Sequence, residues 1–349
     1  MFSPELQIQL SSIEANLKYF RSISKKETEI GIVVKCDAYG LGLKKIVKFF
    51  TTQNIETYFT ATLEEAIQVR KIDKSAKIYT LNGFYFEEAH KYNKYKIFPV
   101  INSVIEVKKF LESGIRPSHV ALQINSGMNR LGINRTTLKE NINLIQKLPV
   151  NLIISHLSSA DEPNSEFNIQ QKREFLKCCD YFPKIRKSLA ASHGALLNKD
   201  FHFDLIRVGI GAYGGIKGEN LRPVLQIKSP IISTNTIKRG MRIGYNLTFK
   251  AKKTMKIATI PTGYGDGISR LLSNRGFLFF QNIKCPIVGR ISMDLLTVDI
   301  SDLKNEPTYL NFFSDQYDVS DMAKQTDTIS HEIFVKLGSR YKRKYFIEK

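Results

Sequence analysis

The first 215 residues of the chain alternate between short apolar runs and amphipathic segments. The apolar runs are rich in β-branched residues and have the length of strands, whereas the segments between them repeat their apolar residues at helical spacing. The candidate strands are GIVVK, TYFTA, KIYTL, KIFPVI, HVALQI, NLIISH, SLAAS and LIRVGIG. Eight strands alternating with helices predict a parallel (β/α)8 TIM-type barrel rather than an open sheet, although periodicity alone does not prove that the ring closes.

The pattern changes after Pro223, where short β-branched and aromatic runs are broken by Gly, Pro and Asn. Few helical stretches follow, which is typical of a β domain. A length of 349 residues also favours one large domain and a smaller one. We therefore expect an α/β chain with a barrel over residues 1–222, followed by a mainly-β C-terminal domain over residues 223–349.

Composition argues against several classes of function. The net charge is +19, but the lysines are scattered beside glutamates and form no long block, so we expect no nucleic-acid partner. No apolar run approaches the length of a membrane span, and we expect no membrane partner. The four cysteines have neither metal-ligand nor disulfide-framework spacing. These features predict a cytoplasmic protein with free thiols and no metal.

Polar residues recur at the carboxyl ends of the candidate strands, which is where a barrel of this kind places its chemistry. Each has a common structural interpretation: a Ser before a helix is usually an N-cap, and a lone Arg is usually a surface charge. Their occurrence on one rim favours a site. The residues are Lys35 after the first strand, Gln123 and Arg130 after the fifth, His156 after the sixth, Ser192 after the seventh, and Arg207 and Gly209 at the eighth.

The run GIGAYG at residues 209–214 fits a dinucleotide-binding pattern, but the loop-like, proline-broken segment GIKGENLRPV follows it. A dinucleotide fingerprint would open a helix. We interpret the run as a phosphate site instead, formed by Ser192 and the amides near Gly209 and Ile210, because barrels often bind phosphate after strands seven and eight. A phosphate site together with a lysine that can form a Schiff base suggests pyridoxal phosphate. Arg207 would then face the ring nitrogen and leave it unprotonated.

The chain resembles the alanine racemases, a family of pyridoxal-phosphate enzymes that combine a barrel with a β domain and act as homodimers. The resemblance runs nearly end to end, and its motifs occur in the expected order. These motifs are VVKCDAYGLG, NSGMNRLG, SHLSSAD, RVGIGAYGG, GYNLTF, PTGYGDGISR, VGRISMD and RYKRKY.

The resemblance implies that Lys35 carries the cofactor as an aldimine and serves as the base on one face of the α-carbon of alanine. Tyr245 would be the opposite base and would come from the other subunit of a homodimer with shared active sites. Because a phenol has a pKa of about 10, it needs help to act as a base. His156 is expected to hydrogen-bond Tyr245, and Arg207 is expected to link that histidine to the ring nitrogen.

The remaining roles are also carried over from the family. Arg130 would contact the ring hydroxyl and the substrate carboxylate, which the backbone amide of Met293 would also hold. Tyr264 would line the entry. The phosphate would be bound by Tyr39, Ser192, Tyr345 and the amides of Gly209 and Ile210. Packing at an interface is nearly as good an interpretation for Tyr264 and Tyr345.

Several positions depart from the family pattern. Gln123 occupies the position of a lysine that is carbamylated in many relatives, so Arg130 must be oriented by a neutral amide, with or without a bound anion. Ser188 replaces a common histidine, Val208 a common proline, and Gly244 a common serine. These differences affect the reaction rate and the surroundings of the site residues rather than the class of reaction.

The sequence therefore predicts an alanine racemase that supplies D-alanine for peptidoglycan. A serine or broad-specificity racemase is the nearest alternative, because one methylene or hydroxyl in a small pocket is worth only about 1–3 kcal/mol. A pyridoxal-phosphate carrier without turnover is a second alternative, although such carriers generally lack the domain that contains Tyr245. Barrel-type decarboxylases favour a carboxylate at the ring nitrogen, and Arg207 argues against them.

Overall fold

The computed structural model describes residues 3–115, 117–218 and 220–347. The chain divides into two compact units. One comprises Leu17–Ala38 and Gly42–Ala212, and the other comprises the residues up to Asn16, Tyr39–Leu41 and the residues from Tyr213 onward. Within the described residues, no helix has the length and apolar character needed to cross a bilayer.

The larger unit contains an eight-stranded parallel sheet in the order β8-β7-β6-β5-β4-β3-β2-β9. An isolated parallel bridge between Ala191 and Arg207 joins its two ends, which confirms the expected barrel. The strands are β2 (Glu29–Val33), β3 (Thr57–Thr60), β4 (Lys77–Thr80), β5 (Phe98–Ile101), β6 (Val120–Gln123), β7 (Val150–Ile154), β8 (Arg186–Ser188) and β9 (Leu205–Val208).

Seven of these strands overlap the expected runs closely, whereas β8 lies earlier than SLAAS. The difference has a local cause, because the carbonyl oxygens of Ser188 and Leu189 accept hydrogen bonds from the guanidinium of Arg207. Backbone pairing continues beyond β8, because the Ser188 carbonyl also accepts from the Ser155 amide at 3.1 Å and the Ala190 carbonyl accepts from the Arg207 amide at 2.9 Å.

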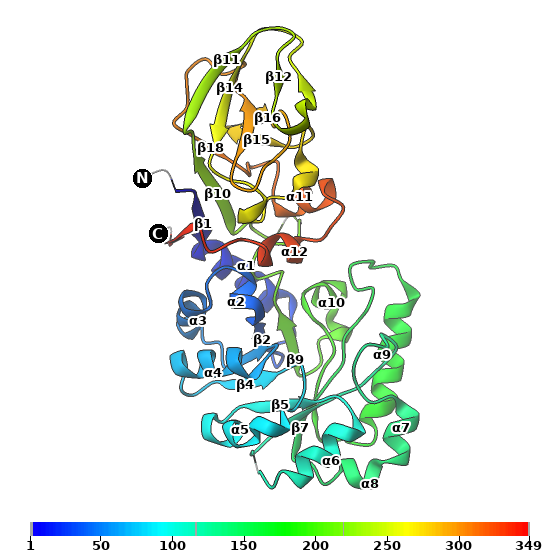
Figure 1. Ribbon diagram of the computed structural model, residues 1–349. Helices are drawn as coiled ribbons and strands as arrows, with labels where there is room; N and C mark the ends of the chain where they lie inside the picture. The colour runs from blue at the N-terminus through cyan, green and yellow to red at the C-terminus, as the bar shows by residue number, and fades with distance from the viewer. Residues whose placement is uncertain (1–2, 116, 219, 348–349) are drawn as a thin grey trace. The chain divides into compact units, whose positions relative to one another are not determined.

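Helices lie outside the barrel strands (Figure 1). Capping sets where they begin: Thr62 and Glu65 form a capping box at the start of α4, and the Ser103 hydroxyl accepts from the amide of Glu106 at the start of α6. The helices are α1 (Leu10–Ile23), α2 (Lys35–Tyr39), α3 (Leu43–Thr51), α4 (Leu63–Ile72), α5 (Ala89–Tyr95), α6 (Val104–Glu112), α7 (Arg135–Glu140), α8 (Ile142–Ile145), α9 (Glu166–Cys179) and α10 (Ser192–Leu197).

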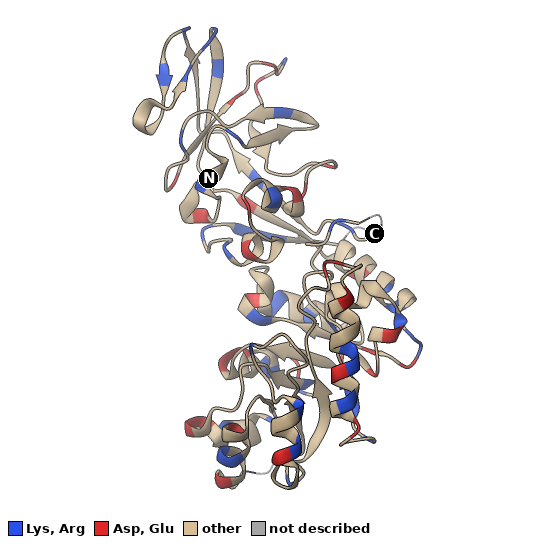
Figure 2. Cartoon of the chain, turned by 90° about the vertical axis from the view of Figure 1, so that its right-hand side faces the viewer, with Lys and Arg blue, Asp and Glu red and all other residues tan. Residues whose placement is uncertain are grey.

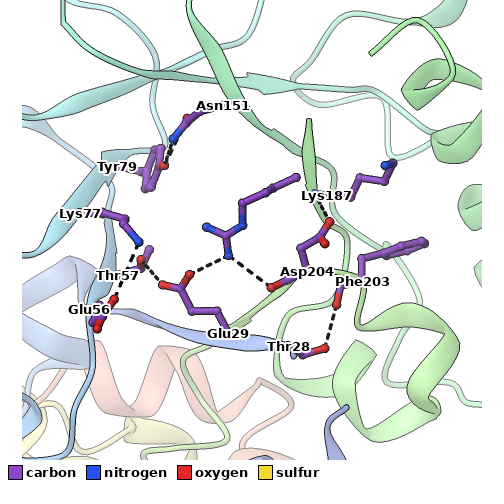
Figure 3. A network of polar contacts seen from close by, with 11 residues as sticks. Thr28, Glu29, Glu56, Thr57, Lys77, Tyr79, Asn151, Lys187, Phe203 and Asp204 are labelled. Carbon is purple, nitrogen blue, oxygen red and sulfur yellow. Dashed lines mark hydrogen bonds and ion pairs between the residues drawn. The ribbon is translucent and has the colours of Figure 1, made fainter. Parts of the chain in front are cut away.

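The amino ends of the strands hold a network of polar contacts (Figure 3). The Glu29 carboxylate accepts hydrogen bonds from the hydroxyl of Thr57 and, at 2.6 Å, from the guanidinium of Arg186. In a barrel this end serves stability, while chemistry occurs at the opposite end. The network therefore joins β2, β3 and β8 away from the candidate site.

The smaller unit is mainly β, as expected. Its six-stranded sheet has the order β16-β15-β18-β10-β1-β19, and a three-stranded sheet has the order β11-β14-β17. Strands β12 (Arg242–Ile243) and β13 (Phe249–Lys250) pair separately. The other strands are β1 (Glu5–Gln9), β10 (Leu225–Pro230), β11 (Ser233–Ile237), β14 (Met255–Ile260), β15 (Phe277–Phe280), β16 (Ile283–Pro286), β17 (Leu296–Asp299), β18 (Tyr309–Asn311) and β19 (Lys342–Phe346); the helices are α11 (Val319–Gln325) and α12 (Ser330–Val335).

Charge is distributed over both units. Figure 2 shows basic and acidic residues interspersed along the chain, in agreement with their mixing in the sequence. The division of the chain after residue 222 stays a prediction.

Candidate active site

Lys35 lies just beyond β2, two residues after the strand ends at Val33, and its side chain is half-buried. The backbone that follows is left-handed: φ is 53° at Cys36, 55° at Asp37, 52° at Ala38 and 56° at Tyr39. Such residues each cost on the order of 1–2 kcal/mol, so a run of them persists only where other contacts hold it.

Hydrogen bonds within the barrel unit hold this left-handed turn. The amide of Cys36 donates to the Glu65 carboxylate at 2.6 Å, and the amide of Leu43 donates to the Asp37 carboxylate at 2.7 Å. The turn begins with a bond from the Ala38 amide to the Val34 carbonyl at 3.0 Å. Lys35 is therefore fixed at the carboxyl end of its strand by a strained but well-anchored segment.

Ser192 is the first residue of α10 and is buried. Its hydroxyl oxygen accepts hydrogen bonds from the amides of Gly209 at 3.0 Å and Gly211 at 3.1 Å. Ile210 lies between these two amides and is buried as well. The GIGAYG run is thus a turn after β9 that closes on Ser192, and it does not open a helix. The run therefore lacks the helix that a dinucleotide fingerprint would open, and its role in binding phosphate stays a prediction.

Arg207, in β9, is the most unusual charge in the barrel unit. Its side chain is buried, and this burial lowers the pKa of the guanidinium to about 10, so the group is still a cation at neutral pH. It donates to the carbonyl and hydroxyl oxygens of Ser188 at 2.8 and 2.6 Å, and to the carbonyl of Ser155. Among residues 3–115, 117–218 and 220–347 no carboxylate pairs with it, and burial alone lowers its pKa.

A buried cation that is held only by neutral groups has a large desolvation cost, which an external acceptor would offset. The pyridine nitrogen of pyridoxal phosphate is such an acceptor. The half-buried amine of Lys35 and the Ser192 turn provide the two other anchors that this cofactor needs. The residues present therefore fit the group.

His156 and Arg130 follow β7 and β6. The His156 Nδ1 lies 3.5 Å from the Arg207 guanidinium, which matches the expected link between these two residues. Arg130 is exposed, and its guanidinium forms no hydrogen bond or ion pair within the part of the chain that the structure describes. It is available for an anionic ligand.

Tyr264 and Met293 lie on adjoining turns of the smaller unit. The amide of Gly265 donates to the Met293 carbonyl at 2.9 Å, and the amide of Tyr264 donates to the Ser292 carbonyl at 3.1 Å. Beneath them the buried carboxylate of Asp266 pairs with Arg340 at 2.8 Å. The structure thus brings Tyr264 and Met293 close together, on two exposed turns that hydrogen-bond to each other.

Tyr245 opens a separate turn of the same unit, and 69% of its side chain is exposed. Tyr345, in β19, donates from its hydroxyl to the carbonyl of Leu41 at 2.8 Å. The ring of Tyr39 lies 5.0 Å from the ring of Tyr213. The phosphate-binding roles of Tyr39 and Tyr345 stay predictions.

Two contributors to this geometry were not predicted from the sequence. One is the Asp266–Arg340 pair, for which the sequence contains no signal because the partners are 74 residues apart. The other is Gln171 in α9, which is fully buried. A signal for it existed: Gln171 shares a helix face with Phe175 and Cys178, and a polar residue on an apolar face calls for explanation.

Known proteins match nearly the whole chain. Residues 8–217 match the model of the alanine racemase N-terminal domain, and residues 224–345 match that of the C-terminal domain. The chain is 36% identical to the alanine racemase of Rickettsia canadensis, covering 97% of this chain and 98% of that protein. It is 35% identical to the alanine racemase of Cereibacter sphaeroides, covering 99% of each.

Solved structures give the same result. The alanine racemase of Bartonella henselae, crystallised with covalently bound pyridoxal phosphate, superposes with a TM-score of 0.92 at 31% identity, covering 99% of each chain. The biosynthetic alanine racemase of Pseudomonas aeruginosa also has a TM-score of 0.92, at 28% identity, covering 99% of this chain and 100% of that one. With a site that fits pyridoxal phosphate and these matches over both of its domains, the chain belongs to the alanine racemase family.

Proposed function

We propose that this chain interconverts L-alanine and D-alanine with pyridoxal phosphate bound at Lys35. The observation that supports this most strongly is Arg207, a buried cation without a carboxylate partner among the described residues. A neutral, unprotonated pyridine facing Arg207 is a weaker electron sink than a protonated one, and it suits reversible proton transfer at the α-carbon better than loss of a carboxylate. The expected D-alanine would supply peptidoglycan synthesis.

Pyridoxal phosphate, when bound, supplies an electron sink that makes the α-proton of an amino acid acidic. Residues 1–222 would bind it: Lys35 would hold its carbonyl carbon, Arg207 its ring nitrogen, and Arg130 its ring hydroxyl. The residues that would hold the phosphate are Tyr39, Ser192, Tyr345 from residues 223–349, and the amides of Gly209 and Ile210. Arg130 and the Met293 amide also hold the substrate carboxylate, and Tyr264 lines the entry.

Two bases move the proton from opposite faces of the α-carbon. Lys35 serves one face and Tyr245 serves the other. Because a phenol has an ordinary pKa of about 10, Tyr245 needs a neighbour that takes up or shares its proton. His156, which lies 3.5 Å from Arg207, fills this role and connects the second base to the buried cation.

Tyr245 reaches the site from the partner subunit of a homodimer. The segment that contains it exposes three large apolar side chains, with Met241 49%, Tyr245 69% and Leu247 52% exposed. Apolar side chains that gather on a surface are typical of a protein interface. A monomer then lacks one base and does not racemise.

A cytoplasmic location is part of the same proposal. All four cysteines are free, which suits a reducing compartment.

Proton NMR of L-alanine in deuterated water, with the cofactor-loaded protein and a chiral assay for the product, tests the proposal. We expect the α-proton signal to disappear while D-alanine accumulates, and a parallel sample with L-serine ranks the two substrates. Bound pyridoxal phosphate without α-proton exchange would instead indicate a carrier protein.

A further inference from the structure

Gln171 of α9 lies beneath the loops that carry His156 and Arg130, and none of its side chain is exposed. Its Oε1 accepts hydrogen bonds from the amide of Ser158 at 2.9 Å and from its hydroxyl at 3.1 Å. Its Nε2 donates to the carbonyl of His156 at 3.0 Å and to the hydroxyl of Ser126 at 3.3 Å. The carboxamide thereby uses both of its hydrogens and both of its oxygen lone pairs.

The partners fix the orientation of this carboxamide. A backbone amide such as that of Ser158 can only donate, so it must face the oxygen, and the carbonyl of His156 can only accept, so it must face the nitrogen. Exchanging the oxygen and nitrogen would break both bonds. Gln171 therefore holds the His156 loop in one arrangement.

The contact with Ser126 extends the network toward Arg207. The Ser155 hydroxyl donates its single hydrogen to the Ile124 carbonyl at 2.7 Å, so the Ser126 hydroxyl must be the donor in the 2.8 Å contact between the two serines. The carbonyl of Ser155 in turn accepts from the guanidinium of Arg207. Hydrogen bonds thus run from Gln171 through Ser126 to the Ser155 hydroxyl, and the backbone of Ser155 links them to Arg207.

Gln171 also contacts the turn that carries Arg130. A β-carbon at Gly127 would lie 2.9 Å from the ring of Phe167 and 3.4 Å from Cγ of Gln171, so this turn packs directly on α9. The Asn125 side chain closes the turn by accepting from the amides of Gly127 and Asn129, both at 3.1 Å. Ser126, the partner of Gln171, lies between Asn125 and Gly127 in this turn.

We propose that Gln171 is a positioning residue for the reaction: its buried carboxamide sets the place of His156, and through Ser126 and Ser155 the place of Arg207, relative to the bound cofactor. It touches neither substrate nor cofactor. The inference rests on the proposed racemase function. It adds a residue that acts on the reaction through His156 and Arg207.

The test compares Gln171→Met, which keeps the length of the side chain and loses all four hydrogen bonds, with Gln171→Glu, which keeps the acceptors and loses both donors. Asn168→Leu is the matched control. Asn168 is one turn earlier on α9, is buried, and donates to the carbonyls of Ser159 and Glu162, which lie farther along the loop than the partners of Gln171. Ser126→Ala removes the next hydrogen bond along the chain without changing α9.

We expect both Gln171 variants to lower kcat about tenfold to hundredfold, because a small misplacement of catalytic groups has effects of this size. They should also displace the pH profile of kcat/KM and the pH dependence of the bound cofactor's absorption. Ser126→Ala should shift both profiles in the same direction. The double variant of Gln171→Met and Ser126→Ala should shift them by less than the sum of the two single shifts. Asn168→Leu should lower the melting temperature and leave both profiles unchanged.

Wild-type kcat and pH profiles in Gln171→Met would overturn the inference, and so would equal changes in Asn168→Leu. If Gln171→Met does not fold, the inference is tested with Gln171→Glu and Ser126→Ala. Wild-type kcat and pH profiles in these two variants, or equal changes in Asn168→Leu, would overturn it. A wild-type chain that binds pyridoxal phosphate without racemising alanine would overturn the proposed function alone. The absorption titration of the same variants would still decide the role of Gln171.

Discussion

The guanidinium of Arg207 donates hydrogen bonds to both oxygens of Ser188, at 2.8 Å to the carbonyl and 2.6 Å to the hydroxyl. Ser188 is the last residue of β8 and is itself fully buried. A small hydroxyl therefore occupies the place of the larger histidine that the family pattern led us to expect behind the arginine. It compensates part of the desolvation cost of the buried cation.

Ser188→Ala should destabilise the chain and change the environment of the cofactor. Removing the hydroxyl leaves one hydrogen of a buried cation unpaired, which costs about 1–3 kcal/mol in the free energy of unfolding. Urea unfolding measures this loss, and a pH titration of the bound cofactor's absorption measures the effect on Arg207. Ser24→Ala is the control, because its buried hydroxyl donates to the Phe20 carbonyl at 2.7 Å away from Arg207. An equal shift of the titration in both variants would contradict this role of Ser188.

Tyr245→Phe should keep the cofactor and lose racemisation. The ring still packs, but the proton on one face of the α-carbon has no base, and the loss of a positioned acid or base typically costs about 10²–10⁴-fold in rate. The chiral assay measures the rate, and the absorption spectrum reports whether the cofactor is bound. Unchanged turnover would remove Tyr245 from the proposed mechanism.

Mixing Lys35→Ala and Tyr245→Phe subunits should restore activity. Each variant alone lacks one base, whereas a mixed dimer with sites shared between subunits contains one site with both. The measurement is D-alanine formation after subunit exchange, with the exchange followed by mass-tagged subunits. Mixed dimers that form and show no activity would contradict the shared site.

The sequence was sufficient to predict the barrel, because eight strand-like runs alternated with helical segments and several of their carboxyl ends carried polar residues. Arg207 was selected because it lies at the end of the eighth strand run with the other polar residues, and its role toward the ring nitrogen stays a prediction. The displaced β8 was not foreseen, because it depends on which carbonyl oxygens Arg207 engages. The partners of Gln171 were not foreseen for a related reason: Ser126, His156 and Ser158 lie on loops whose meeting point only the folded chain defines.

Glu29→Gln should lower stability near neutral pH and leave it unchanged in acid. Burial by itself would raise the pKa of Glu29, but hydrogen bonds from Thr57 and Arg186 outweigh it and hold the pKa below its ordinary value of 4.5. The native state thus favours the ionised form. Its contribution is fully present above pH 4.5 and is lost as the pH falls through the lowered value in the folded chain.

We expect a difference of about 1 kcal/mol in the free energy of unfolding between wild type and Glu29→Gln at pH 7. Urea unfolding at a series of pH values should show this difference shrinking below pH 4.5. Glu56→Gln is the control from the same network, since Glu56 is 3.9 Å from Lys77 and its side chain is 76% exposed. Exposed ion pairs of this kind contribute little to the free energy of unfolding, so Glu56→Gln should change it little. A pH-independent difference for Glu29→Gln would contradict the lowered pKa assigned to Glu29.

Gly244→Ala should disturb the turn that carries Tyr245. Gly244 has φ 74° and ψ −173°, a conformation that is almost confined to glycine and costs other residues on the order of 1–3 kcal/mol. An added β-carbon would also lie 3.3 Å from the amide nitrogen of Arg290. A serine, the common family residue here, would face the same strain, so the turn of this chain depends on its glycine.

The expected result is a lower melting temperature together with a lower racemisation rate, because relief of the strain would move Tyr245. Differential scanning calorimetry and the chiral assay measure the two effects. Gly218→Ala is the control, since its backbone is outside the left-handed region and an added β-carbon meets no atom within 4 Å. Wild-type stability and rate in Gly244→Ala would mean that the turn tolerates a side chain, and that the position of the second base does not depend on this glycine.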